Sequence, residues 1–289
     1  MAMFTSTDDV SGILPEDYAA LIVQPAREAA LALDETHVST VIVTDAHDLV
    51  VPIVVSDGDA GWYEEGADMS GGDGTLDSVK ITPAKVGRVR KISNELADDS
   101  SPEAQELVGT MIGQAIADKI DMAFFGNATA PAPGSPAPAG LPSVATEVSN
   151  VNGVTAWADL DPFAEAISIS EANNGDLSAF VASPGDALAL MTLKKQADNN
   201  EPLLGLDATS ATGRSILGVP LLVSKHVQAG VVWGLDKRYV TVALRKAVDL
   251  DISRDRYFET DQTAVKGAMR LSWAFTHPKA LVRITLAAA

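Results

Sequence analysis

One segment, from Val51 to Val79, constrains the fold more strongly than any other part of this sequence. It contains seven acidic residues and no lysine or arginine, and it includes the run SGGDG at 70–74. The acidic residues are Asp57, Asp59, Glu64, Glu65, Asp68, Asp73 and Asp77. Apolar, β-branched arms on both sides of a glycine-rich tip predict a long β-hairpin. Its apolar content is too small for a core, and an isolated hairpin is marginally stable in water, so we expect it to act outside its own subunit.

The arm that returns from the tip is basic, and a long helix follows it. One strand is predicted for SVKITPAKVGRVRKIS at 78–93, with Lys80, Lys85, Arg88, Arg90 and Lys91. Ser100 or Ser101 can cap the helix, and Pro102 fits its first position. Apolar residues then recur at three- and four-residue steps, and Gly126 ends the pattern. These residues are Leu107, Val108, Met111, Ile112, Ala115, Ile116, Ile120, Ala123, Phe124 and Phe125.

Two glycines interrupt this long helix. About 24 residues give a rod of roughly 36 Å. Gly109 and Gly113 lie one turn apart inside it, and each weakens a helix by about 1 kcal/mol relative to alanine. We hypothesise that they permit close packing or bending of the helix.

The other elements indicate an α+β class with mostly antiparallel sheet. A helix is predicted from Pro15 to Leu33, and a Pro/Ala/Gly connector at 127–142 marks a boundary. Further helices are predicted at 161–172 and from Pro184, the latter capped by Ser183 and with lysines in its last turn. Strands are predicted at 37–43, 48–56, 178–183, 216–224, 231–236, 239–253, 265–276 and 280–286.

Composition excludes several functional classes. The net charge of −18 disfavours a nucleic-acid-binding protein, because affinity for phosphate comes from lysine and arginine. The chain has no cysteine, which excludes disulfides and thiolate metal sites. The N-terminus does not resemble a secretory signal, and no apolar run approaches the roughly 18 residues of a membrane helix. We therefore expect a soluble, intracellular protein that binds no membrane.

No catalytic, cofactor or metal-binding motif is present. The sequence lacks P-loop, dinucleotide-loop and nucleophile-elbow spacings. The stretch 57–68 is a poor calcium loop, because Gly61 and Asp68 replace expected ligands. The run Ser224–His226 is interpreted as a surface polar run, and Asp98, Asp99 and Glu103 as helix N-terminal charges. The histidines, His37, His47, His226 and His277, are not spaced as metal ligands.

Several segments, taken in order, resemble the major capsid protein of tailed bacteriophages, the family with the Hong Kong 97-type fold. They are GWYEEGADM at 61–69, ITPAKVGRVRKISNELADDS at 81–100 and the helix at 101–127. The second half also fits, through FVASPGDALALMTLKK at 180–195, SILGVPLLVSKHV at 215–227 and the run 233–285. The resemblance covers nearly the whole chain, and the combination of segments is its specific part.

The resemblance implies a non-enzymatic shell subunit. It implies an N-terminal arm with entry strands (1–50), an extended loop (51–92), a spine helix (93–127), a mainly axial domain (128–235) and long, mainly peripheral strands (236–289). Pentamers and hexamers would form an icosahedral head that encloses double-stranded phage DNA without specific binding. Implied partners are a portal, a separate scaffolding protein and a decoration protein, with assembly in the host cytoplasm. Covalent crosslinking of the loop is disfavoured, because the tip from Trp62 to Asp77 has no lysine.

We expect the acidic loop to dock on a basic patch of a neighbouring subunit. The loop residues are Trp62, Tyr63, Glu64, Glu65, Asp68 and Asp73, and the candidate patch is Arg88, Arg90, Lys91, Arg245, Lys246, Arg254 and Arg256. Alternatively, the acids only keep the loop soluble. Two other functions stay open at this point: the shell of an encapsulin-type nanocompartment, and, in a different class, a soluble acidic hydrolase.

Overall fold

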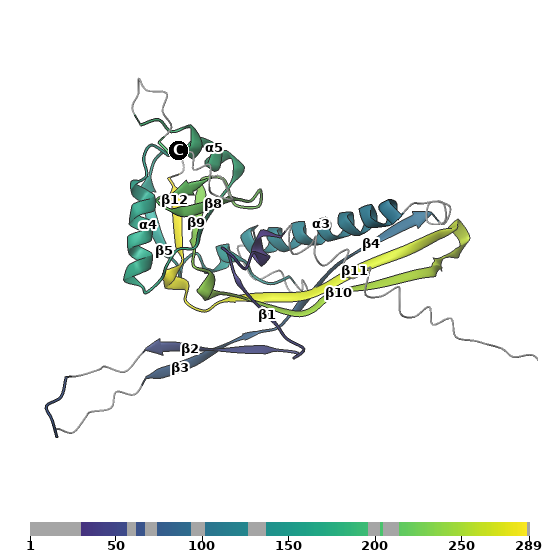
Figure 1. Ribbon diagram of the computed structural model, residues 1–289, viewed down its shortest axis with the longest axis horizontal. Coiled ribbons are helices and arrows are strands. Elements are labelled where there is room, and N and C mark those ends of the chain that lie inside the picture. The colour runs from purple at the N-terminus through teal and green to yellow at the C-terminus, as the bar shows by residue number, and fades with distance from the viewer. Residues whose placement is uncertain are drawn as a thin grey trace, which may run out of the picture.

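Two β-sheets and a projecting two-stranded hairpin organise the chain (Figure 1). The computed structural model describes residues 30–56, 62–66, 74–93, 102–126, 137–195, 203–204 and 214–287. Within these ranges six strand pairings are antiparallel and three are parallel. The predicted α+β class with mostly antiparallel sheet is therefore confirmed.

A four-stranded sheet carries the long helix on one face (Figure 1). Its order is β1 (Thr40–Val43), β10 (Val240–Tyr257), β11 (Gln262–Phe275) and β4 (Ala84–Ser93). The helix α3 spans Pro102–Gly126, as its proline start and glycine end predict. Ile112, Ile116, Ile120 and Phe124 recur every four residues and are buried against the sheet. Met111, which we placed in the same apolar stripe, is 38% exposed instead.

A six-stranded sheet forms the second part of the body. Its order is β5 (Ser149–Val154), β12 (Val282–Leu286), β9 (Val231–Leu235), β6 (Ala179–Ala182), β8 (Val219–Val223) and β7 (Ser215–Ile216). The helices α4 (Asp161–Ala172) and α5 (Pro184–Thr192) contribute to its core, where the Phe163 and Phe180 rings lie 5.1 Å apart. Short 3-10 helices complete the described chain: η2 (Leu31–Leu33), η3 (Leu141–Val144), η4 (Lys237–Tyr239), η5 (Phe258–Thr260) and η6 (Pro278–Ala280).

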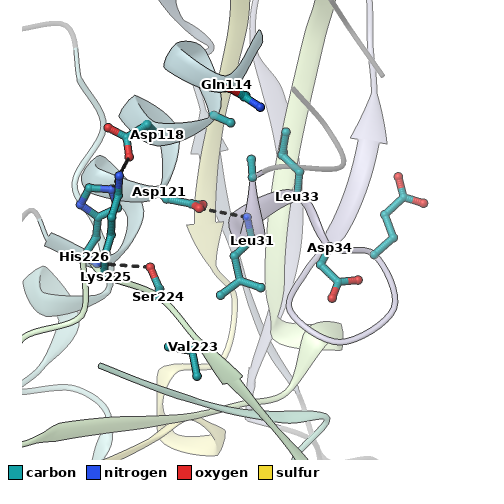
Figure 2. Close-up of a pocket in the computed structure, with 13 residues that line it drawn as sticks. Leu31, Leu33, Asp34, Gln114, Asp118, Asp121, Val223, Ser224, Lys225 and His226 are labelled. Carbon is teal, nitrogen blue, oxygen red and sulfur yellow. Dashed lines mark hydrogen bonds and ion pairs between the residues drawn. The ribbon is translucent and has the colours of Figure 1, made fainter. Parts of the chain in front are cut away.

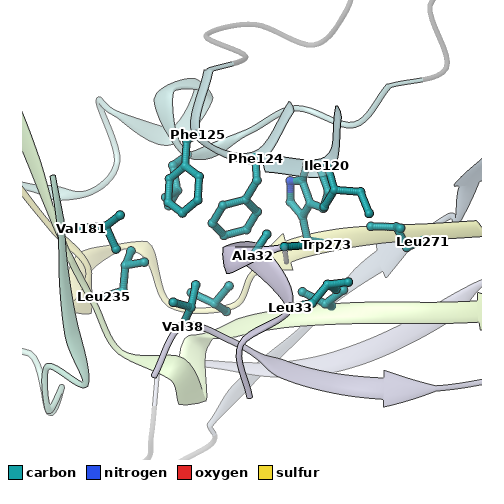
Figure 3. Close-up of a cluster of buried hydrophobic side chains, with 14 of the residues drawn as sticks. Ala32, Leu33, Val38, Ile120, Phe124, Phe125, Val181, Leu235, Leu271 and Trp273 are labelled. Carbon is teal, nitrogen blue, oxygen red and sulfur yellow. The ribbon is translucent and has the colours of Figure 1, made fainter. Parts of the chain in front are cut away.

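The largest hydrophobic core lies where the helix α3 meets both sheets (Figure 3). The ring of Phe124 is centred 4.9 Å from that of Phe125 and 5.2 Å from that of Trp273, both nearly edge to face. Leu33 enters this core from the N-terminal side, and Leu235 enters it from the six-stranded sheet. The same cluster therefore joins the segment around η2, the helix and both sheets.

The hairpin consists of β2 (Leu49–Ser56) and β3 (Thr75–Ile81), paired antiparallel from Leu49 opposite Ile81 to Ser56 opposite Thr75. We call β2, β3 and the described residues 62–66 between them the finger. Figure 1 shows the finger projecting away from both sheets.

Three local predictions are wrong. The strand expected to run unbroken over 78–93 is two strands, β3 and β4, because Pro83 lacks the N–H that a continuing ladder needs. The strand expected at 216–224 is a hairpin, since Leu217 and Gly218 take positive φ angles of 51° and 88° in a tight turn. The helix α5 ends at Thr192, so no lysine lies in its last turn.

Two predictions fall partly outside the described residues. Of the helix expected from Pro15 to Leu33, only its end is described, as the 3-10 helix η2. The caps Ser100 and Ser101 lie outside the described residues, as do the acids Asp98 and Asp99.

Candidate subunit-contact surfaces

One face of the finger is partly buried, and we call the opposite, solvent-exposed face the open face. On the first face Leu49, Val51 and Val79 are half-buried and Ile81 is buried. The alternate residues form the open face, because successive side chains of a strand point to opposite sides. On that face Val54 is 60% and Leu76 74% exposed, and these two residues pair directly across the strands. The finger thus presents apolar side chains to solvent on a face that no other described part of the chain covers.

The described part of the tip is aromatic and acidic. Trp62 is fully exposed, at 105% of its reference area, and Tyr63, Glu64 and Glu65 are also exposed. Of the predicted loop contacts, Asp68 and Asp73 lie outside the described residues, as does most of the stretch 57–68 that we disfavoured as a calcium loop.

The base of the finger is tied by a polar cluster around Asp48. Its carboxylate lies 2.7 Å from Lys80 Nζ and accepts a hydrogen bond of 2.7 Å from the Thr82 hydroxyl. The hydrogen bond from Lys80, followed by that from Thr82, holds the pKa of Asp48 well below its usual range. These contacts join the residue before β2 to the end of β3 and to the residues that connect β3 with β4.

The predicted basic patch does not form one surface. The β4–β11 register is continuous, so side chains along β4 alternate between the two faces of the sheet. Arg90 lies on the α3 side, where its Nη1 donates to Met111 Sδ at 3.3 Å, and Arg88 has the same parity. Lys91 lies on the other side, where its Nζ stands 4.1 Å from the centre of the Tyr257 ring. Arg245, Lys246, Arg254 and Arg256 are all on β10.

A cavity of about 310 Å³ lies between α3 and the start of β4, and we call it the helix–strand cavity. Ile120 and Trp273 contribute buried apolar surface to it, and Lys85 and Lys119 are its charged lining residues. The other lining residues within the described ranges are Ala84, Val86, Gly87, Ala123, Ala137, Pro138 and Leu271. This cavity is a largely apolar opening beside the edge strand β4.

A second cavity, of about 580 Å³, lies between η2, α3 and the turn after β8, and we call it the junction cavity (Figure 2). Asp121 of α3 is buried there and accepts hydrogen bonds from the backbone N–H groups of Leu31 at 3.1 Å and Ala32 at 2.9 Å. Burial raises the pKa of Asp121, against the opposing effect of these two hydrogen bonds. The carboxylate fastens the segment around η2 to the long helix.

A second carboxylate of the junction cavity contacts both a histidine and a lysine. Asp118 Oδ1 lies 3.0 Å from His226 Nε2, and it also forms an ion pair with Lys225. The hydrogen bonds from Lys225 and then from His226 lower the pKa of Asp118. Interpreting Ser224–His226 as a surface polar run was wrong, because Ser224 is buried and the His226 side chain is only 16% exposed. For Asp121, the other carboxylate of this cavity, the sequence did carry a signal. It directly follows the buried Ile120 on the apolar face of the helix, where an acidic residue is unexpected.

The two helix glycines, Gly109 and Gly113, are both buried. The described residues contain no cluster of three or more histidine and carboxylate side chains placed to hold a metal ion. Among the helices of the described ranges, none is long and apolar enough to cross a membrane.

A family comparison places these surfaces in context. Residues 11–286 match the profile of the family described as the phage capsid family. The chain belongs to the phage capsid family. That family is structural and non-enzymatic, so this chain is a structural protein of a phage capsid. A curated relative is the "Capsid polyprotein" of Pseudomonas phage PAJU2, 26% identical over 223 residues. The match covers 73% of this chain and 32% of that protein, so the chain spans about a third of its relative's length.

Solved structures show the fold of this phage capsid protein. The structure from Microbacterium phage Oxtober96 matches with a TM-score of 0.68 at 18% identity, covering 90% of this chain and 91% of that one. That from Mycobacterium phage Adephagia matches with a TM-score of 0.69 at 13% identity, covering 100% and 96%. The capsid of an empty GTA particle, computed with C5 symmetry, matches with a TM-score of 0.67 at 19% identity, covering 99% and 96%. The predicted Hong Kong 97-like capsid fold is confirmed.

Proposed function

We propose that this capsid protein assembles through pentameric and hexameric rings into an icosahedral head that encloses double-stranded phage DNA. In each ring the finger of one subunit is steadied by the next copy. The single observation that carries this proposal is the open face of the finger, where Val54 and Leu76 are mostly exposed although they pair with each other. An isolated two-stranded hairpin is marginal in water, so a neighbouring subunit is the natural cover.

The architecture suits a ring of identical subunits. A finger that reaches from one copy to a different surface of the next makes a head-to-tail contact, and such contacts close into rings when the rotation fits. In this proposal α3 and the four-stranded sheet form the peripheral domain, and the six-stranded sheet forms the axial domain. A portal, a separate scaffolding protein and a decoration protein complete the head, which is assembled in the host cytoplasm.

The acidic composition supports a wall that holds DNA without binding it tightly. The net charge is −18, from 39 acidic and 21 basic residues. Such a surface repels phosphate groups, whereas a specific nucleic-acid-binding surface needs clustered lysine and arginine.

Electron microscopy of the purified protein tests the assembly directly. We expect closed shells, and shells recovered from infected cells should hold nuclease-protected double-stranded DNA. A protein that stays monomeric at high concentration, or shells that hold a cargo enzyme in place of DNA, would contradict the proposal.

Electrostatic docking of the finger is tested by the double variant Glu64→Ala/Glu65→Ala. We expect its shells to dissociate at lower temperature than wild-type shells, with the largest difference at low salt, because exposed charges are screened over about 8 Å at physiological ionic strength. The matched control is Glu165→Ala/Glu171→Ala, which removes the same charge from exposed positions on α4. Equal resistance of the finger variant and wild type to salt and heat would mean that these acids only keep the loop soluble.

A further inference from the structure

We propose that Trp62 anchors the finger on the neighbouring subunit by entering that subunit's helix–strand cavity. The inference rests on the proposed docking of the finger and names the contact that achieves it. It assigns an interaction site to two features that are otherwise unexplained, a fully exposed tryptophan and an apolar cavity beside an edge strand.

Among the described side chains of the finger, Trp62 has the largest apolar surface to bury against a neighbouring subunit. Its exposure of 105% means that no other described residue shields the ring. Tryptophan side chains bury about 150–250 Å² and are enriched among the residues that dominate protein interfaces, where they fill well-packed pockets. An exposed tryptophan on a projecting hairpin is therefore placed as an interface anchor.

The helix–strand cavity has the size and lining for one aromatic side chain. Its volume of about 310 Å³ lies at the small end of the pockets that bind small molecules. Ile120 is 2% and Trp273 7% exposed, so both present fixed, packed surface to an entering ring. Trp273 is held further by its Nε1, which donates a hydrogen bond to the Ala139 carbonyl.

The charges around the two features are complementary. Among the described residues, the lining includes Lys85 and Lys119 and no acidic residue, in a chain where acids outnumber bases by 39 to 21. Glu64 and Glu65 follow Trp62 along the tip after one intervening residue, Tyr63, and both are exposed. A tryptophan bound in the cavity would bring these carboxylates close to Lys85 and Lys119. The attraction between opposite charges favours this docked orientation of the finger over others.

The occupant has to be a second copy of this chain. The cavity residues Ala84 and Gly87 follow the base of the finger at Ile81 by only a few positions. The tip lies beyond the opposite end of β2, whose eight residues span about 26 Å at 3.3 Å each. While β2 and β3 stay paired, Trp62 cannot return to its own cavity, and Figure 1 shows the finger pointing away from α3 and β4.

Site-directed crosslinking tests the contact in assembled shells. The chain has no cysteine, so the double variant Glu64→Cys/Lys119→Cys carries the only two thiols. With a short bismaleimide we expect a ladder of covalent oligomers in a denaturing gel. The control Glu64→Cys/Gln114→Cys places the second thiol at an exposed α3 residue that lines the junction cavity instead, and it should give at most a tenth of that yield.

Replacing the anchor isolates the role of the ring. In the Glu64→Cys/Lys119→Cys background, Trp62→Ala should reduce the crosslink yield at least tenfold, and Trp62→Phe should retain most of it. An equal yield with alanine would overturn the assignment of Trp62.

The outcomes separate this inference from the proposed function. Shells that form normally but crosslink equally at both helix positions, or at neither, would overturn the cavity contact and leave shell assembly standing. Failure of the unmodified protein to form shells would overturn the proposed function itself. If the cysteine variants do not assemble, a density map of wild-type shells decides. Density for a neighbour's Trp62 in the cavity supports the inference, whereas residues 1–29, residues 127–136 or another protein in the cavity would overturn it.

Discussion

Replacing Asp121 by alanine is expected to loosen the segment around η2 while the rest of the fold stays intact. The carboxylate accepts hydrogen bonds from the N–H groups of Leu31 and Ala32, 90 and 89 positions away in the chain. Alanine leaves both donors without this acceptor, and an unsatisfied buried donor costs about 1–3 kcal/mol. Two effects reduce the loss: burial already disfavours the charged carboxylate, and Leu31 lines the junction cavity, where water can replace the acceptor. We therefore expect a net cost of about 2 kcal/mol for local opening.

Amide hydrogen exchange measures this local opening directly. Since 1.4 kcal/mol corresponds to a factor of ten, the Leu31 and Ala32 amides should exchange about 30-fold faster in Asp121→Ala. Asp121→Asn keeps one acceptor oxygen, so it should lose about 1 kcal/mol and exchange about fivefold faster. The amides of Val282 and Ile284 in β12 serve as the internal reference and should not change. Equal exchange in wild type and Asp121→Ala, or faster exchange in the asparagine variant than in the alanine variant, would refute the reasoning.

Three further predictions concern α3 and its partners. Phe124→Ala should lower the free energy of unfolding by about 3–5 kcal/mol in chemical denaturation, because the ring is fully buried, whereas Leu188→Ala at a 64% exposed site should change it by about 0.5 kcal/mol or less. The pKa of Asp118 is lowered in the folded protein, so its carboxylate stabilises the fold above an unfolded pKa of about 3.9 and loses this effect as the pH falls through the lower folded value. The melting temperatures of wild type and Asp118→Asn should therefore converge in acid, and a constant difference would contradict the assignment. We propose that α3 bends at Gly109 and Gly113 in a precursor shell and straightens when that shell expands. Alanine at both positions should then alter this transition, followed as particle diameter, and an unchanged transition would count against helix bending at these buried sites.

Elements with strong local signals could be predicted from the sequence. The boundaries of α3 follow from Pro102 and Gly126, and the start of α4 follows from the proline beside it. The cap of α5 was also predicted, since the Ser183 hydroxyl accepts the N–H of Asp186 at 3.2 Å. Each of these signals acts within a few residues along the chain.

Strand pairing and the junction contacts could not be predicted in the same way, because they join distant parts of the chain. Thr40 in β1 pairs with Thr241 in β10, and the short strand β12 joins the six-stranded sheet although the long strands before it belong to the other sheet. The contact between Asp118 and His226 spans 108 positions. Periodicity identifies which residues are apolar or polar, but it does not specify which distant partner each one meets.

The sequence indicates which segment forms the tip of the finger. It does not indicate which residues of the folded protein lie together on the surface that the tip contacts. The acidic tip was identified from its composition, and Trp62 and Glu64 are indeed exposed there. The basic residues were grouped by sequence alone, whereas the regular alternation of β4 directs Arg90 and Lys91 to opposite faces of the sheet. A cavity such as the one between α3 and β4 has no sequence signature, because its walls come from four separate segments.

In the proposed assembly, the free energy gained by docking one finger is too small to drive association alone. Val50, Val54 and Leu76 are the large apolar residues of its open face, each more than half exposed, and burying such side chains fully yields about 1.5–3 kcal/mol each. Association of two proteins costs about 4–15 kcal/mol in lost rigid-body freedom, so one docked finger roughly balances that cost. Closing a ring changes the balance, because each added subunit makes contacts with two neighbours and the later contacts are effectively intramolecular. Isolated dimers joined by a single finger should therefore be scarce at every concentration, and sedimentation should show monomers and complete rings or shells with little between them.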